Sequence, residues 1–286
     1  MSDPSADSAA PPRLGIVGGG RSAWAFAHAW QRIGWPLAGV SLRHGSSSPL
    51  PHLLGIASLA PEDLIRTSDV VLLATPDHAI SDAASIFDCD ADVLLFHSSG
   101  SMDSSILPRR ERAFSLHPLR ALPLPGEPDT FQGTLFVFEG SARGRLLAAS
   151  FVGAAGGTFL EIEARSKPLY HAAAVFGSNY LALLMEQTSD LFKNIGLEGR
   201  VVDEAISALA TSAIKNWLRQ EGTARFTGPI ARADTQLVRT HLDALKDDPA
   251  ALQLYRILGR HLLSRVHQIE RDSPRMAALR GLLESD

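Results

Sequence analysis

Lys167, His171 and Ser178 follow one another at intervals of four and seven residues in a segment with a helical pattern. At 100° per residue, the three side chains fall on one face near the start of the helix. His171 is the best candidate for a proton donor, because an imidazole changes charge near neutral pH. Lys167 is expected to bind a substrate carboxylate or to bias the charge of His171, and Ser178 to contact the substrate. Asn179, about 80° from His171 around the helix, would hydrogen-bond a cofactor amide or the substrate. The alternative is a structural histidine in a helix interface.

His117 is a second acid–base candidate, because it ends an apolar strand pattern and precedes Pro118. Arg120, just beyond it, would bind an anionic group of the substrate. A histidine that only stabilises this turn is an equal alternative. A further anion-binding candidate lies in the segment TGPIARAD at 227–234, where Thr227 and Arg232 would contact the substrate and Asp234 would cap a helix.

The segment GIVGGGRSA at 15–23 contains the pattern G-x-G-x-x-A at Gly18, Gly20 and Ala23. In a dinucleotide-binding turn, the first glycine permits a tight turn, the second lets the backbone approach the pyrophosphate, and the small third residue keeps the helix close to the strand. The pattern follows an apolar strand and opens an amphipathic helix, which is the context such a motif requires. The predicted contacts of this turn are Gly18, Gly19, Gly20, Arg21 and Ser22.

The residues after the second strand pattern distinguish NAD from NADP. An NAD-binding domain carries Asp or Glu about 20 residues past the glycines, where it holds the ribose 2′-hydroxyl. This chain instead has LRHGSSS at 42–48. Arg43 and Ser46 would contact a 2′-phosphate. The alternative is that Arg43 is an ordinary solvated arginine. The sequence predicts NADP as the cofactor.

Two later strand patterns end in short polar turns. Thr75 and Pro76 follow one, and Ser98 and Ser99 follow the next. Ligands of open α/β sheets bind at the carboxyl ends of strands, so these four residues are expected to face the nicotinamide ribose. Asp77 and the histidine after it are expected only to begin a helix.

These candidates need a parallel sheet to position them, and residues 13–163 have its pattern. Several predicted strands are continuous Val/Leu/Ile/Phe runs, as expected of a parallel sheet that is buried on both faces. The predicted strands span residues 14–18, 37–42, 69–74, 92–97, 113–117 and 134–139, and segments such as 22–33 and 61–67 are predicted crossover helices. The fold class is α/β, with a doubly wound Rossmann domain at the N-terminal side.

Residues 164–286 carry helical patterns and no convincing strand, so they predict an all-α domain for substrate binding and dimerisation. Helices are predicted at 168–193, 201–220, 234–246, 249–270 and 274–284. The stretch 172–185 is apolar almost all round, which predicts a helix buried by its neighbours or by a second subunit. A homodimer is the expected assembly.

Composition excludes several other functions. The net charge of −4 and the absence of a clustered basic face argue against nucleic-acid binding. The single cysteine, Cys89, rules out an internal disulfide and is expected to be a small buried hydrophobe, and no metal site is predicted. No apolar run is long enough to span a bilayer, and residues 1–12 read as a disordered tail without the layout of a signal peptide, so the expected location is cytoplasmic. The remaining histidines, including His261 and His267, are expected on the surface.

The motifs GIVGGGRSA, ATPD, HSSGS, SLHPLR, KPLYHAAAVFGSNYLALL and FTGPIARAD together resemble a family of Rossmann-like proteins with a C-terminal helical domain of unassigned function. The family is distantly similar to the 6-phosphogluconate dehydrogenase superfamily, which includes pyrroline-5-carboxylate reductase, ketopantoate reductase and prephenate dehydrogenase. The resemblance implies NAD(P) binding, a helical dimerisation domain and an active site between the two domains.

The resemblance does not carry over every role. β-Hydroxyacid dehydrogenases have a lysine and an asparagine four residues apart, whereas Lys167 and Asn179 are twelve apart. Prephenate dehydrogenases have a His-Pro turn like His117–Pro118, but the glycine and lysine usual around it are absent here. The leading hypothesis is an NADP(H)-dependent reductase or dehydrogenase of a small carboxylate-bearing keto or imino compound. The alternatives are an oxidative decarboxylase like prephenate dehydrogenase and a non-catalytic NADP-binding sensor or accessory protein.

Overall fold

The computed structural model describes residues 10–43, 45–87, 92–128, 131–266 and 274–284. Most of the predicted N-terminal tail, Cys89 and His267 lie outside the described residues. The chain divides into two compact units, Met1–Tyr180 and Leu181–Asp286. The boundary predicted after residue 163 falls inside the first unit, and the division of labour between a cofactor domain and a helical domain stays a prediction.

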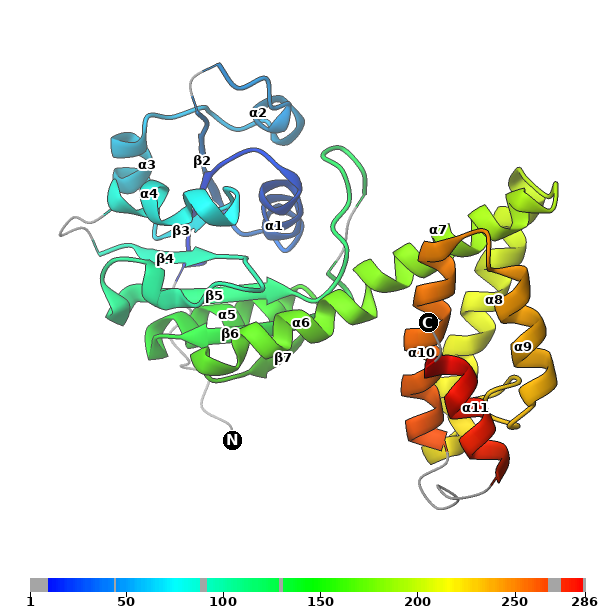
Figure 1. Cartoon of the computed structure of the whole chain (residues 1–286). Helices are drawn as coiled ribbons and strands as arrows, with labels where there is room; N and C mark the ends of the chain where they lie inside the picture. Colours follow the sequence, from blue (N-terminus) through cyan, green and yellow to red (C-terminus); the bar gives the residue numbers. More distant parts are fainter. Residues whose placement is uncertain (1–9, 44, 88–91, 129–130, 267–273, 285–286) are drawn as a thin grey trace, which may run out of the picture. The chain divides into compact units, whose positions relative to one another are not determined.

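Within the described residues, the first unit contains a seven-stranded sheet of order β2-β1-β3-β4-β5-β6-β7 (Figure 1). Its strands are β1 (Leu14–Val17), β2 (Leu37–Ser41), β3 (Val70–Leu73), β4 (Leu94–His97), β5 (Ala113–Pro118), β6 (Leu135–Gly140) and β7 (Thr158–Glu161). Neighbouring strands are parallel except β5 and β6, which are antiparallel. The chain leaves β1 for β2 on one side and returns to β3 on the other, so a topological switch point lies between β1 and β3.

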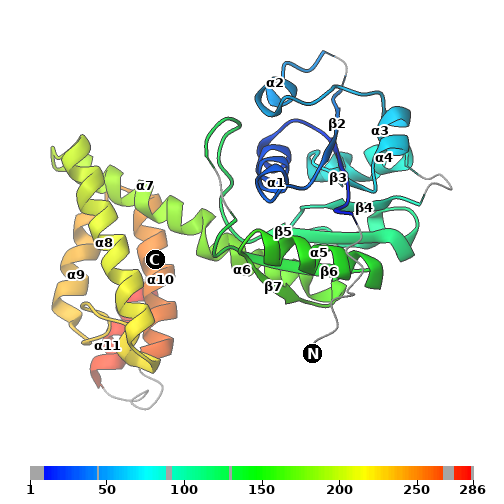
Figure 2. The same ribbon diagram turned by 180° about the vertical axis from the view of Figure 1, so that it is seen from behind.

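Helices cover both faces of this sheet, as views from opposite sides show (Figures 1 and 2). They are α1 (Arg21–Arg32), α2 (Leu50–Leu54), α3 (Pro61–Thr67), α4 (Ile80–Ser85), α5 (Ala142–Ala154) and α6 (Lys167–Gly177). Val70 and Leu72 of β3 pack into the cluster that includes α1, whereas Val71 and Leu73 pack with α3 and α4. Because both faces of the strand are buried, its sequence is continuously apolar instead of alternating.

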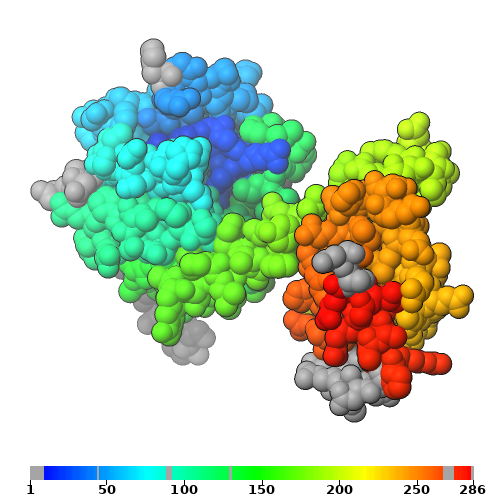
Figure 3. Space-filling view, viewed as in Figure 1, coloured from blue at the N-terminus to red at the C-terminus, as the bar shows by residue number. Residues whose placement is uncertain are grey.

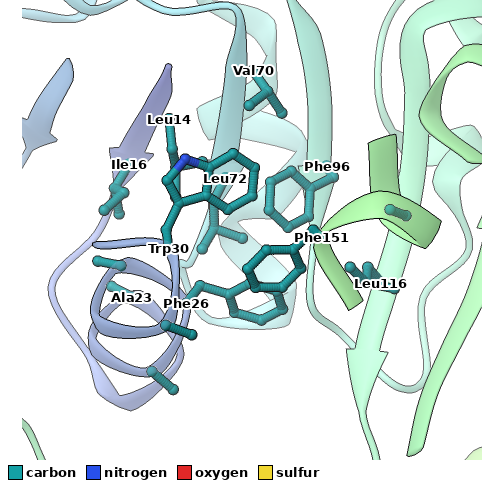
Figure 4. Packing of buried hydrophobic residues seen from close by; sticks show 14 of the residues in the cluster. Leu14, Ile16, Ala23, Phe26, Trp30, Val70, Leu72, Phe96, Leu116 and Phe151 are labelled. Atoms are coloured by element: carbon teal, nitrogen blue, oxygen red, sulfur yellow. The ribbon is translucent and has the colours of Figure 1, made fainter. Parts of the chain in front are cut away.

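Aromatic side chains fix α1 against the sheet. The Phe26 ring of α1 lies 5.5 Å from the Phe96 ring of β4 and 5.8 Å from the Phe151 ring of α5, measured between centroids. Trp30, one turn further along α1, stacks on Phe151 at 4.9 Å (Figure 4). Such edge and stacked pairs add to the burial energy of the rings. This packing sets the N-terminus of α1 at the carboxyl end of β1.

The six strands predicted from the sequence are present, but two features were not predicted. β7 pairs in parallel with β6 after the α5 crossover, and its residues are mostly exposed or half-buried, so its sequence lacks the buried apolar run. The antiparallel pairing of β5 with β6 departs from the expected all-parallel sheet. A single strand does not encode its direction, because parallel and antiparallel buried strands are equally apolar.

The second unit is built from helices among its described residues. They are α7 (Asn179–Asn194, whose first two residues belong to the first unit), α8 (Arg200–Arg219), α9 (Thr235–Ala244), α10 (Pro249–Val266) and α11 (Pro274–Glu284). Val238 and Leu242 of α9 meet Leu263 of α10 and Leu279 and Leu283 of α11 in one buried cluster. Across the described part of the chain, no helix is long and apolar enough to cross a membrane.

The predicted helix at 168–193 is two helices, α6 and α7, because the backbone leaves the helical region at Ser178 (φ −129°, ψ −67°). The predicted burial of this segment is wrong for the single chain. Leu169 is 78% exposed and Phe176 is 70% exposed, and the space-filling view has α6 on the outer surface of the first unit (Figure 3). The apolar pattern of α6 therefore has no covering element among the described residues of this unit.

Candidate active site

The glycine turn after β1 has the geometry of a phosphate-binding turn. Gly18 has φ +105°, and a Cβ built on it would lie 2.5 Å from the Ala74 carbonyl oxygen, so neither the backbone nor the space admits a side chain. Gly20 begins α1 without a capping side chain, no acidic residue occupies the first turn of α1, and a Cβ on Gly20 would meet nothing within 4 Å. The unpaired N–H groups of a helix start attract anions, and this one is open.

Two more predicted cofactor residues border the same turn. Thr75 follows β3 across the switch point, and its hydroxyl oxygen is buried without a hydrogen-bond partner among the described residues. Ser22 in the first turn of α1 and Ser98 after β4 join their hydroxyl groups at 2.5 Å. Pro76 is exposed beside Thr75. An orphaned buried hydroxyl and an open helix start are features that a bound dinucleotide would satisfy.

The loop after β2 is attached to the glycine turn. The Ser48 hydroxyl donates to the Gly19 carbonyl oxygen at 2.8 Å, and a Cβ on Gly19 would collide with that hydroxyl. Arg43 and Ser46 are exposed in the same loop, where the Ser46 N–H donates to the Arg43 carbonyl oxygen at 3.0 Å. The loop therefore presents an arginine and serines beside the phosphate-binding turn, with no carboxylate between residues 42 and 48.

Lys167 lies in the interior of the first unit, with only 1% of its surface exposed. Its ammonium group donates to the Ser99 carbonyl oxygen at 2.9 Å and to the Ser115 hydroxyl, and it lies 3.9 Å from Glu139 Oε1. Burial lowers the pKa of Lys167 to about 8, against the opposing attraction of Glu139. The ammonium therefore joins α6 to β4, β5 and β6, where the sequence suggested a substrate contact.

Glu139 completes this buried network. It accepts from the Ser104 backbone N–H at 2.6 Å and from the Ser104 hydroxyl at 2.9 Å. Burial raises the pKa of the Glu139 carboxyl, with the Ser104 hydroxyl and Lys167 opposing. A buried lysine is acceptable only when it is paired and hydrogen-bonded, and Glu139, Ser99 and Ser115 supply those partners.

His117 and His171 meet above Gly100. A Cβ built on Gly100 would lie 2.7 Å from His171 Nδ1 and 3.0 Å from His117 Nε2, so only glycine leaves room for both rings. Their ring centroids are 6.4 Å apart. His171 Nδ1 is buried without a hydrogen-bond partner among the described residues. His117 Nδ1 lies 2.6 Å from the Tyr170 hydroxyl, and burial, aided by Lys167 and His171, lowers the pKa of His117 to about 4.

The HSSGS turn that carries Gly100 is held by its own hydrogen bonds. Asp77, after β3, accepts from the Ser99 and Ser101 hydroxyls at 2.8 Å each. His97 Nδ1 accepts from the Ser99 backbone N–H at 3.2 Å, and burial lowers the pKa of His97 to about 4, which keeps it neutral. Asp77 begins a 3₁₀ turn, as predicted, and also fixes the serine turn.

The remaining predicted cofactor, catalytic and substrate residues lie on separate segments of the chain. Arg120 is exposed and its Nε donates to the Ala121 carbonyl oxygen at 3.2 Å, and Arg21 is exposed with its guanidinium 3.4 Å from the Leu122 carbonyl oxygen. Ser178 and Asn179 bond each other at the break between α6 and α7. Thr227 and Arg232 lie exposed in the second unit. Asp234 caps α9 through the Leu237 N–H at 3.1 Å, as predicted.

Sequence reasoning missed Tyr170, Glu139, Ser115 and the second role of Asp77. Two of them carried a signal. Glu139 is the one charged residue at the end of the apolar run TLFVFE, and Tyr170 directly precedes His171 on the predicted helix. Among the described residues, no group of three or more His, Cys, Asp or Glu side chains is placed to hold a metal ion.

The sheet order, the glycine turn and the helical C-terminal unit define a Rossmann-like α/β fold with an all-α C-terminal part. The family described as "Domain of unknown function (DUF2520)" matches residues 134–262. No curated protein matches the chain in sequence.

Solved structures with this fold include oxidoreductases with NADP or NAD bound. A Bacteroides fragilis protein provisionally described as an NADP oxidoreductase matches with a TM-score of 0.72 and 20% identity, over 89% of this chain and 99% of its own. The protein TM1727 from Thermotoga maritima matches with a TM-score of 0.71 and 22% identity, over 89% and 98%. Pyrroline carboxylate reductase of Plasmodium falciparum, solved with NADP bound, matches with a TM-score of 0.59 and 12% identity, over 93% and 98%. At these identities the likeness establishes the fold.

Proposed function

We propose that this protein is an NADP(H)-dependent oxidoreductase that interconverts a small carboxylate-bearing keto or imino compound with its reduced form. The observation that carries the proposal is the pair of imidazoles above Gly100, at the same sheet edge as the open glycine turn of β1. Solved proteins of this fold include pyrroline carboxylate reductases and a reductive aminase with NADPH, which supports hydride chemistry on small C=O or C=N groups.

The cofactor would be held along the switch point of the sheet. The first turn of α1 would receive the pyrophosphate on its free N–H groups, and Thr75 Oγ1 would gain the partner that it lacks. Arg43 and Ser46 would bind the 2′-phosphate, which favours NADP over NAD. When bound, the nicotinamide supplies or accepts a hydride.

The reacting group of the substrate would lie against His117 and His171. His171 Nδ1 has no hydrogen-bond partner in the described part of the chain, so it is available to a substrate oxygen or nitrogen. Lys167 would act as a positioning residue, because its ammonium fixes the Ser99 carbonyl oxygen and thereby the turn under the two rings. Arg120 of the first unit and Ser178, Asn179, Thr227 and Arg232 remain candidates for contacting the rest of an anionic substrate.

The experiment is a titration of the full chain with NADPH and NADH, followed by cofactor oxidation with a panel of 2-oxo acids and cyclic imines. We expect tighter binding of NADPH and turnover with one substrate class. Binding of neither dinucleotide would refute the proposal. Tight NADPH binding without turnover on any member of the panel would indicate a non-catalytic cofactor-binding protein instead of an enzyme.

A further inference from the structure

Tyr170 holds His117 in a fixed orientation. Tyr170 lies in the first turn of α6, and its hydroxyl oxygen is 2.6 Å from His117 Nδ1. The two rings meet edge to face, with centroids 5.7 Å apart and planes at 80°. In the proposed function, Tyr170 has no role beyond this contact. One imidazole nitrogen is thereby occupied, and the other is left for a ligand.

The chemistry of the two groups indicates which one donates. A phenol is a stronger hydrogen-bond donor than a neutral imidazole N–H, and an unprotonated imidazole nitrogen is a stronger acceptor than a phenolic oxygen, so the Tyr170 hydroxyl is expected to donate to Nδ1. If the Tyr170 hydroxyl donates to Nδ1, the neutral imidazole carries its proton on Nε2. Burial keeps both groups uncharged, because it raises the pKa of Tyr170 to about 12 and lowers the pKa of His117 to about 4.

His117 Nε2 is directed at the proposed reaction centre. It lies 3.0 Å from the Cβ position of Gly100, as does the neighbouring Cε1, and His171 Nδ1 lies 2.7 Å from the same position. No described residue hydrogen-bonds Nε2. An N–H group at this place can bind an atom that has a lone pair, such as a carbonyl oxygen. A preformed iminium nitrogen has no lone pair and cannot accept from it.

We propose that His117 donates its Nε2 proton to the oxygen of a carbonyl substrate, and that Tyr170 is the positioning residue that fixes this tautomer and replaces the proton. The inference rests on the proposed reductase function. In the reduction, the carbonyl carbon accepts a hydride from the reduced nicotinamide while the C=O π bond breaks onto oxygen. The oxygen takes the Nε2 proton while Nδ1 takes the phenolic proton. After the product leaves, Nδ1 returns its proton to the tyrosinate and water restores the proton on Nε2. An alkoxide is a stronger base than a phenolate, so the net transfer of a proton from the tyrosine to the product is energetically favourable.

The first test needs no substrate. Imidazole ¹⁵N shifts of the histidine-labelled full chain, with His117 assigned by its loss in His117→Gln, report which nitrogen carries the proton. We expect the Nε2–H tautomer at neutral pH in the wild type and a mixture of tautomers in Tyr170→Phe. A wild-type His117 with its proton on Nδ1 would overturn the inference, because Tyr170 would then accept and Nε2 could not donate.

The chain offers a matched control in its second unit. His241 Nδ1 lies 2.9 Å from the Tyr255 hydroxyl, with ring centroids 5.8 Å apart, so Tyr255→Phe removes a similar pair far along the sequence. With NADPH and a carbonyl substrate, we expect Tyr170→Phe to lower kcat by about 10²-fold, the lower end of general acid catalysis, with little change in KM. Tyr255→Phe is expected to leave kcat unchanged.

The outcomes separate the inference from the function on which it rests. Turnover by the wild type with equal kcat in the two tyrosine variants would refute the role of Tyr170 alone. A wild type that binds NADPH and turns over no substrate would refute the reductase function, and the ¹⁵N tautomer would still decide the state of His117. Reduction of permanently charged N-alkyl iminium ions in preference to carbonyls would contradict the assigned substrate class.

Discussion

Replacing Lys167 with methionine is expected to change how the free energy of unfolding depends on pH. Burial lowers the pKa of Lys167 from 10.5 to about 8 in the folded chain. A displacement of this size corresponds to about 3 kcal/mol, at 1.36 kcal/mol per pKa unit. The unfolded chain binds the proton more tightly, so this destabilisation is fully present below about pH 8 and is relieved as the pH rises toward 10.5. Between about pH 7 and pH 9.5, the wild type should therefore gain about 2 kcal/mol relative to Lys167→Met.

The assay is urea unfolding of both proteins at the two pH values, and the measured quantity is the difference between their unfolding free energies. Titrating groups that do not interact with Lys167 cancel in that difference. The absolute effect at pH 7 is not the test, because methionine avoids the burial of a charge but leaves Glu139 and the Ser99 carbonyl oxygen without their partner. Lys193→Met is the control, since Lys193 is about half exposed and its pKa is raised by the hydrogen bond to Asp190. The wild type could gain no more unfolding free energy between the two pH values relative to Lys167→Met than relative to Lys193→Met. That result would refute the claim that Lys167 is buried as an ammonium.

Three further substitutions and one measurement on the intact chain test the rest of the site. Arg43→Asp is expected to weaken NADPH about 10–100-fold more than NADH in a fluorescence titration, because a charge-assisted contact of about 1.5–3 kcal/mol is lost; equal losses would contradict the NADP assignment. Gly100→Ala places a methyl group 2.7 Å from His171 Nδ1, so kcat should fall while NADPH affinity is kept; unchanged kcat would show that the two rings do not act together. His171→Gln should lower kcat about tenfold, the value of one hydrogen bond of ~1.5 kcal/mol, and a variant that melts early yet retains its turnover would make His171 a packing residue. Light scattering should find a homodimer that covers Phe176, which is 70% exposed, and a particle of 30.7 kDa at micromolar concentration would contradict this.

The parts of the site that the sequence predicted are those whose geometry is local. The glycine turn needs only Gly18, Gly20 and the strand and helix on either side, and these are contiguous in sequence. His117 was selected because it ends a strand, and His171 because it lies in the first turns of a helix. Each was predicted separately. Their meeting above Gly100 depends on how α6 lies against β5, which no local pattern encodes.

The burial of Lys167 could not be predicted for a different reason. Lysine is almost never fully buried unless it is paired, so its residue type argues for the surface and for a substrate contact. The partners that make burial possible come from three separate strands: the Ser99 carbonyl oxygen after β4, Ser115 on β5 and Glu139 on β6. The apolar pattern of α6 predicted cover by its neighbours or by a second subunit, and within the described part of the first unit Leu169 and Phe176 stay largely exposed.

The buried lysine also explains how His171 on α6 is held at a fixed position relative to His117 on β5. β5 is fixed by its pairing with β4 and β6, whereas α6 has an exposed outer face and few buried side chains to fix it; Lys167 is its one fully buried residue. A shift of α6 by one residue would turn it by about 100°, which would withdraw the ammonium from Ser99 and move His171 off Gly100 together. Charged, hydrogen-bonded groups in an interior tolerate few alternative positions, so the pairing fixes register even where it adds little net stability. Lys167→Met is therefore expected to lower kcat even under conditions where it leaves the free energy of unfolding unchanged.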